Sequence, residues 1–86
     1  MIEVQLKDGT AIVAKDRINE DENLLVLTGP MVRMVGQDMF CWPVEVARVQ
    51  KAFVVYSAHI NEDAAMGDPA YRKVAGMMRG VTIVGG

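Results

Sequence analysis

Alternating apolar and polar residues mark the start of the chain as β-structure. Residues 2–6 alternate strictly, and Asp8-Gly9 follows them as a typical hairpin turn. Residues 10–18 continue with several β-branched side chains, although the run Lys15-Asp16-Arg17 makes the far half polar. The pattern therefore predicts an N-terminal β-hairpin whose second strand projects into solvent at its end.

The residues after this hairpin predict further strands separated by short turns. The polar cluster 19–23 is a turn by composition, and the apolar run 24–28 is typical of a strand buried on both faces. Gly29-Pro30 interrupts the pattern before residues 31–35 resume it, which favours a bend within one long strand over a hairpin between two. After a turn at residues 36–38, two more strands are expected at residues 39–49, with Pro43 at an edge or bulge, and at residues 52–57.

The periodicity changes from strand to helix after Ser57. Asp68 is a suitable N-cap, and Pro69 suits the first position of a helix. The apolar residues that recur at helical spacing are Ala70, Val74, Met77 and Met78. They predict a short helix over residues 69–78, after which residues 81–84 alternate again and form a candidate last strand.

These elements predict an all-β fold. Five strands on tight turns and one short helix favour a small, strongly bent, five-stranded antiparallel barrel of the SH3-like class with a short C-terminal helix. A flat sheet would leave residues 24–27 half exposed, whereas closure buries both faces of the bent central strand. Without internal repeats or a linker, residues 1–86 are expected to form a single domain, with the barrel core at about 1–57 and the helix and tail at about 58–86.

Composition narrows the function classes. A chain of 86 residues can bury one small core, and a net charge of −2 gives no overall positive field toward nucleic acid, so such binding needs a local patch. The single cysteine, Cys41, cannot form an intrachain disulfide and is expected in the core or an interface. The sequence shows neither a signal-peptide pattern nor an apolar run of about 20 residues, which favours a cytoplasmic protein that does not contact membranes.

No residue pattern predicts catalysis. Ser57 and His59 stand two positions apart, but no acid is placed to orient the histidine, and no oxyanion loop is present. One histidine and one cysteine cannot supply the ligands of structural zinc, and no phosphate-binding glycine loop occurs. We therefore expect no enzyme, metal, cofactor or small-molecule substrate.

Two segments resemble the motifs of the Sm-like RNA-binding proteins. Leu6-Lys7-Asp8-Gly9-Thr10, followed by Asp16 and by Asn23-Leu24, resembles the first Sm motif. Met78-Arg79-Gly80-Val81-Thr82-Ile83 resembles the second. As a whole, the chain is most similar to the marine-metagenome group of Sm-like proteins thought to come from cyanophages.

The resemblance implies a homo-oligomeric ring of about five to seven subunits that binds single-stranded RNA or DNA. It assigns base contact to Asn23 and nucleic-acid contact to Arg79 and Gly80, whereas the alternative roles are a turn residue for Asn23 and an ordinary helix end with Gly80 as its cap. In the family the second motif lies between the last two strands. Residues 81–84 are therefore either an extra strand here, or two of the expected strands are one.

Two functions follow from these observations. The first is an Sm-like ring that binds single-stranded nucleic acid and takes part in its processing, and Asn23 with Arg79-Gly80 favours it. The alternative is a non-catalytic structural or adaptor protein of phage origin that acts through protein contacts only, and the negative net charge favours it. The soft side chains that could line a contact between subunits are Met31, Met34, Met39, Met77 and Met78.

Overall fold

The structure, a computed structural model, describes residues 1–80 without the side chains at positions 19 and 20. Its strands are β1 (Ile2–Leu6), β2 (Thr10–Glu20), β3 (Leu24–Val35), β4 (Asp38–Trp42), β5 (Val46–Gln50) and β6 (Val54–His59). A 3-10 turn, η1 (Lys51–Phe53), joins β5 to β6, and the helices α1 (Glu62–Ala65) and α2 (Pro69–Gly80) follow. The candidate strand at 81–84 lies outside the described residues.

The strands form one antiparallel sheet with the order β4-β3-β2-β1-β6, and β5 pairs with β3. The long strand β3 pairs with β2 on one side, while on its other side it pairs first with β5 and then with β4. Within residues 1–80, β6 pairs only with β1, and β4 and β5 pair only with β3, so the sheet is not closed. The prediction of a mainly β, antiparallel fold with a short C-terminal helix is confirmed.

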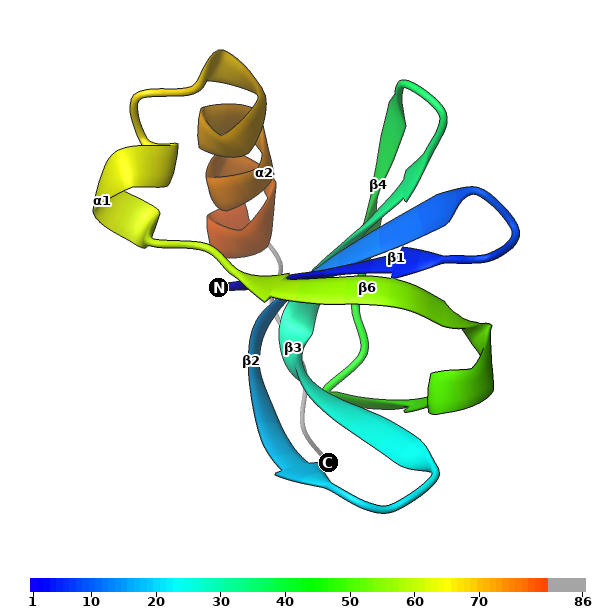
Figure 1. The fold of residues 1–86 in the computed structure, drawn as a ribbon. Coiled ribbons are helices and arrows are strands. Elements are labelled where there is room, and N and C mark those ends of the chain that lie inside the picture. Colours follow the sequence, from blue (N-terminus) through cyan, green and yellow to red (C-terminus); the bar gives the residue numbers. More distant parts are fainter. Residues whose placement is uncertain (81–86) are drawn as a thin grey trace.

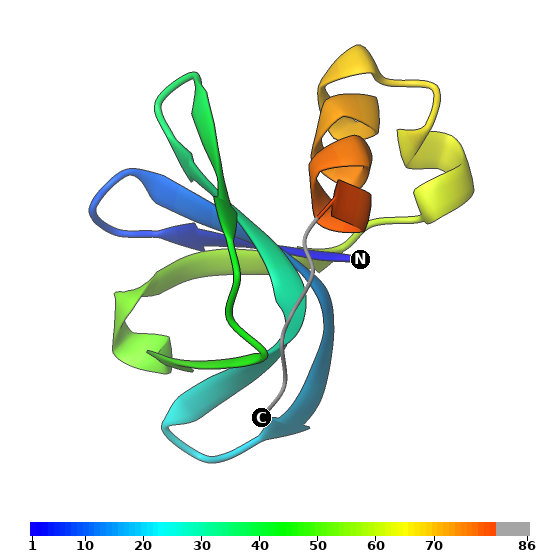
Figure 2. The same cartoon turned by 180° about the vertical axis from the view of Figure 1, so that it is seen from behind.

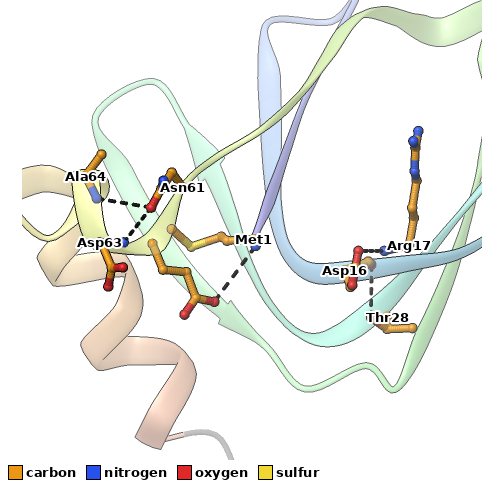
Figure 3. A network of polar contacts seen from close by, with 8 residues as sticks. Met1, Asp16, Arg17, Thr28, Asn61, Asp63 and Ala64 are labelled. Atoms are coloured by element: carbon orange, nitrogen blue, oxygen red, sulfur yellow. Dashed lines mark hydrogen bonds and ion pairs between the residues drawn. The ribbon is translucent and has the colours of Figure 1, made fainter.

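The middle of β3 is where the sheet changes direction. Gly29-Pro30 lies between the halves that pair with β5 and β4, and the Gly29 N–H donates to the Glu45 carbonyl at 2.6 Å. On β2 the register shifts between Ala14 and Asp16, and the Thr28 hydroxyl donates to the Asp16 carbonyl at 2.9 Å (Figure 3). The expected bend within one long strand is therefore confirmed.

The expected single strand at residues 39–49 is wrong. Pro43 cannot donate a hydrogen bond, and the chain leaves the sheet at residues 43–45, so β4 and β5 are separate strands. This raises the number of strands from the expected five to six. The expected strand at residues 52–57 begins two residues later, because residues 51–53 form η1.

The main core lies inside the bend of the sheet. Its buried members come from β1, β2, β3 and β5: Ile2, Val4, Ile12, Ala14, Leu25, Leu27, Met31 and Ala47. In residues 24–28 only Leu25 and Leu27 are buried, and the alternate side chains are half-buried. The prediction that this segment is buried on both faces is therefore wrong for its second face.

A second, smaller core joins α2 to the other face of the sheet. Val13 and Val32 pack with Val74 of α2, and Met1, Met34, Met39, Met77 and Met78 surround them. Both views of the fold show the two helices together on one side of the sheet (Figures 1 and 2). Of the methionines expected at a contact between subunits, Met31 is buried in the main core, and Met34 and Met39 of the sheet with Met77 and Met78 of α2 pack partly buried around the second core.

Local hydrogen bonds explain the turns and helix starts. The Thr10 N–H and hydroxyl donate to Asp8 at 2.9 and 2.6 Å, and the hydroxyl bond in particular holds the pKa of the Asp8 carboxyl below its usual value. Gly9 has φ +89°, as the predicted hairpin turn requires. Asp68 caps α2 by accepting from the Ala70 N–H at 2.9 Å, as expected, and the helix extends to Gly80. The short helix α1, capped by Asn61, has no counterpart among the predicted elements.

Cys41 lies on β4 and is exposed, so of the two expected positions, core or interface, the core is wrong and the interface stays a prediction. Its Sγ is 3.7 Å from the Met77 carbonyl of α2 and can donate a weak hydrogen bond to it. On β4 the side chains of Met39 and Trp42 are half-buried, whereas those of Phe40 and Cys41 are exposed.

Glu3 of β1 ties α2 to the sheet. The Tyr71 hydroxyl of α2 donates to one Glu3 carboxylate oxygen, and the Tyr56 hydroxyl of β6 donates to the other at 3.4 Å. The hydrogen bond to Glu3, with partial burial, raises the pKa of Tyr71 from 10.0 to about 12. The folded chain therefore holds this proton more tightly than the unfolded chain does.

We expect the Tyr71→Phe variant to lose about 1.5–3 kcal/mol of unfolding free energy at neutral pH, the range for a hydrogen bond to a charged group. Because the folded pKa lies above the unfolded one, this stabilisation is complete below pH 10.0 and is lost as the pH rises toward about 12. Urea titrations at pH 7, 9 and 11 measure it. Equal alkaline losses of stability in the variant and the wild type would contradict the assignment.

Candidate nucleic-acid interface

Asn23 lies in the turn between β2 and β3, at the end of the sheet far from the helices (Figure 1). Its side chain is exposed, and its main-chain carbonyl accepts a hydrogen bond from the Lys51 N–H at 2.9 Å. The turn itself is closed by the Asp21 N–H, which donates to the Leu24 carbonyl at 3.1 Å. The β2–β3 turn and η1 are therefore fixed against each other through the main chain.

A groove of about 340 Å³ lies where these two segments meet. It is lined by Asn23, Leu24, Gln50, Lys51 and Ala52. Gln50 and Lys51 were not predicted as site residues. The available signal was their position at the connection from β5 to β6, because the Sm-like resemblance expects the second motif between the last two strands.

The groove has mixed electrostatics. Lys51 is exposed at its edge, and the exposed carboxylates of Asp21 and Glu22 lie in the same turn as Asn23. The Asp21 carboxylate accepts from the Glu22 N–H at 2.6 Å, so part of its hydrogen-bonding capacity is used within the turn. An anionic ligand is attracted by Lys51 and repelled by the turn.

The chemistry of the lining residues suits a nucleotide. The carboxamides of Asn23 and Gln50 can both donate to and accept from a base edge, and the Lys51 ammonium can contact a phosphate. Phe53, in η1, is 57 % exposed and offers a ring on which a base can stack.

Arg79 and Gly80 lie elsewhere in the chain, at the C-terminal end of α2. Arg79 lines a different cavity, between the helices and the sheet, so a single chain does not bring it together with Asn23. Arg79 and Gly80 are the last described residues of α2, as the alternative role of an ordinary helix end expects, but Gly80 belongs to the helix and its φ is not positive, so it is not a left-handed cap. The Arg79 side chain is exposed in the last helical turn, where the helix dipole favours a cation.

Ser57 and His59 are exposed on β6, opposite Val4 and Ile2 of β1. In the part of the chain that the structure describes, no three histidine, cysteine or acidic side chains are grouped so that they could hold a metal ion. None of the helices described there has the length and apolar character needed to cross a membrane.

The fold and the groove thus define a small β protein whose two ends, one with a polar groove and one with helices, are chemically distinct. Comparison of the chain with models of known protein families, with curated proteins and with solved structures finds no match.

Proposed function

We propose that this chain is an Sm-like ring subunit that binds single-stranded nucleic acid in the groove between the β2–β3 turn and η1. The observation that carries the proposal is the hydrogen bond from the Lys51 N–H to the Asn23 carbonyl, which fixes a base-reading amide beside a cation. In this proposal each subunit is a strongly bent, barrel-like sheet with two edge strands that are free within residues 1–80, and the bound nucleic acid takes part in nucleic-acid processing.

Two strand edges support assembly into a ring. β4 and β6 each pair with only one neighbour within residues 1–80, so both present unused main-chain donors and acceptors. Large apolar side chains are exposed on both edges: Phe40 on β4, and Val55 and Tyr56 on β6. Pairing of β4 of one subunit with β6 of the next is head-to-tail, and such contacts close into rings.

We propose that Arg79 and Gly80 contact nucleic acid that is bound in the groove of a neighbouring subunit, as the resemblance implies. A ring can bring the end of α2 of one subunit toward the groove of the next, which a single chain does not do. We expect Arg79→Ala to weaken binding of single-stranded RNA less than loss of Lys51, because Lys51 lines the groove directly.

The second candidate is a structural or adaptor role. The exposed side chains of Phe40, Phe53, Val55 and Tyr56 are suited to protein contacts, and the acidic β2–β3 turn opposes nucleic acid. This candidate also predicts an oligomer but no binding of oligonucleotides.

We expect the purified chain to assemble into a ring of about five to seven subunits, because pairing of the free edges removes them. Size-exclusion chromatography with multi-angle light scattering at micromolar concentration measures the mass. A monomer under these conditions would rule out the ring. Val55→Pro, on the free edge strand, is expected to shift the mass toward smaller species because proline removes a main-chain donor.

We expect a short oligouridine or oligoadenine to bind saturably at low salt, in the micromolar range or weaker because of the acidic turn. Duplex of the same length should bind less well, because its bases are not free to enter the groove. Fluorescence anisotropy with a labelled oligonucleotide measures both. An intact ring that binds neither oligonucleotide would favour the adaptor role.

A further inference from the structure

A second cavity, of about 440 Å³, lies between the helices and the bend of the sheet. Its walls come from β2, β3, α1, α2 and the N-terminal residue. The groove with Asn23 and Lys51 shares none of these residues, so the two sites are separate within the chain. Cavities of this volume are large enough for a small organic ligand.

The cavity carries two cations that the rest of the described chain does not neutralise. Lys15 extends from β2 and Arg79 from the last turn of α2, and both side chains are exposed. The ion pair found within residues 1–80 joins Met1 and Glu62 and involves neither of them. Both cations are therefore available to an anion in the cavity.

The other walls are largely apolar. Met66 at the C-cap of α1, Met78 of α2 and Pro30 of β3 line them, and the thioethers of methionine adapt to ligands of different shapes. Met66 is 41 % exposed although it belongs to this cavity, so its side chain is available for contact.

Two carboxylates limit the charge that the cavity accepts. Glu62 and Asp63 line it from α1. The Glu62 Oε1 atom lies 3.8 Å from the amino group of Met1, and this ion pair offsets part of the Glu62 charge. An anion is therefore favoured only at the wall formed by β2 and the end of α2, and a ligand with several negative charges is repelled by α1.

We infer that this cavity binds a small organic monoanion with an apolar body. The charged head lies between Lys15 and Arg79, and the body lies against Met66, Met78 and Pro30. This site is additional to the proposed nucleic-acid groove, and it gives Arg79 a ligand within its own subunit.

The test uses 8-anilinonaphthalene-1-sulfonate, an apolar monoanion whose fluorescence rises on binding, with the full-length chain. We expect saturable binding that octanoate displaces. Acetate, which has no apolar body, and octanol, which has no charge, should displace the probe at least about tenfold less effectively. Equal displacement by octanol would show a merely apolar cavity and would overturn the inference, as would the absence of saturable binding.

Variants locate the probe. Lys15→Gln and Arg79→Gln should each weaken it about threefold to tenfold, the range between an exposed ion pair and a hydrogen bond to a charged group. Arg72→Gln is the matched control, because Arg72 is exposed on the same helix but does not line the cavity. Weakening by Arg72→Gln equal to that by Arg79→Gln would overturn the inference. Because bound RNA can engage Arg79 in the proposed ring, saturating oligouridine should weaken binding of the probe no more than Arg79→Gln does, whereas complete displacement of the probe would show that the cavity belongs to the nucleic-acid path and would overturn the inference.

Discussion

Replacing Leu25 with alanine is expected to lower the free energy of unfolding by about 2–5 kcal/mol. Leu25 is 2 % exposed and packs with Leu27 and Ile12 in the core inside the bend of the sheet. Removal of its three outer carbon atoms leaves a cavity that the surrounding strands fill only in part, because β3 is held by neighbours on both sides.

Val26 is the matched control for this prediction. It is the next residue on β3 and its side chain is half-buried, so Val26→Ala should cost only about 1 kcal/mol. Urea denaturation of both variants at one protein concentration measures the difference, and the concentration must be fixed because assembly adds to stability. Similar midpoints for the two variants would contradict the assignment of Leu25 to the core face.

Replacing Lys51 with glutamine is expected to weaken binding of single-stranded RNA and to reduce its dependence on salt. Each phosphate contact to a single strand contributes about −0.7 to the slope of log K against log salt. A homo-oligomer loses Lys51 from every subunit at once, so the slope should flatten by about 0.7 for each subunit that the oligonucleotide contacts. Asn23→Ala should instead weaken binding with little change of slope, because the amide contacts bases rather than phosphates.

Arg48→Gln provides the control for this charge change. Arg48 is exposed on β5, three residues before Lys51, and it does not line the groove. A loss of long-range attraction alone would affect the two variants equally. Equal flattening of the slope by Arg48→Gln and Lys51→Gln would therefore contradict a phosphate contact in the groove.

The sequence predicted those elements whose signals are local. Asp8-Gly9 predicted the turn of the first hairpin, and Asp68 as N-cap with Pro69 predicted the start of α2; the structure contains both. The bend at Gly29-Pro30 was also predictable, because a proline in a strand removes a donor and glycine permits the turn.

The errors arose where a residue's surroundings come from distant parts of the chain. Val26 has the same apolar character as Leu25, but its face of β3 is only partly covered, because α2 packs on Val32 at the other half of the strand. Cys41 was expected in the core or an interface from its type, whereas the structure leaves it exposed on β4, beside the Met77 carbonyl of α2. No local pattern could predict these differences.

In the candidate site, too, the residue with a local signal was predicted and the residue placed by distant contacts was not. Asn23 was predicted from a motif-like segment, and the structure places it at an exposed turn beside a groove. Lys51 is 28 positions further along the chain and meets Asn23 only because β5 pairs with β3. In the sequence it was one of several scattered basic residues, whereas Arg79 stood next to a glycine in a recognisable pattern.

Chemical-shift mapping by NMR directly tests whether single-stranded nucleic acid binds in the groove between the β2–β3 turn and η1. Short oligouridine is titrated into the isotope-labelled assembled protein, and the backbone amides are followed by a method suited to large assemblies. We expect the largest shifts at Asn23, Leu24, Gln50 and Lys51, which line the groove. Shifts at Lys15 and Met66, which line the cavity between the helices and the sheet, should be much smaller. Shifts confined to the end of α2, or no saturable shifts in an intact oligomer, would contradict it.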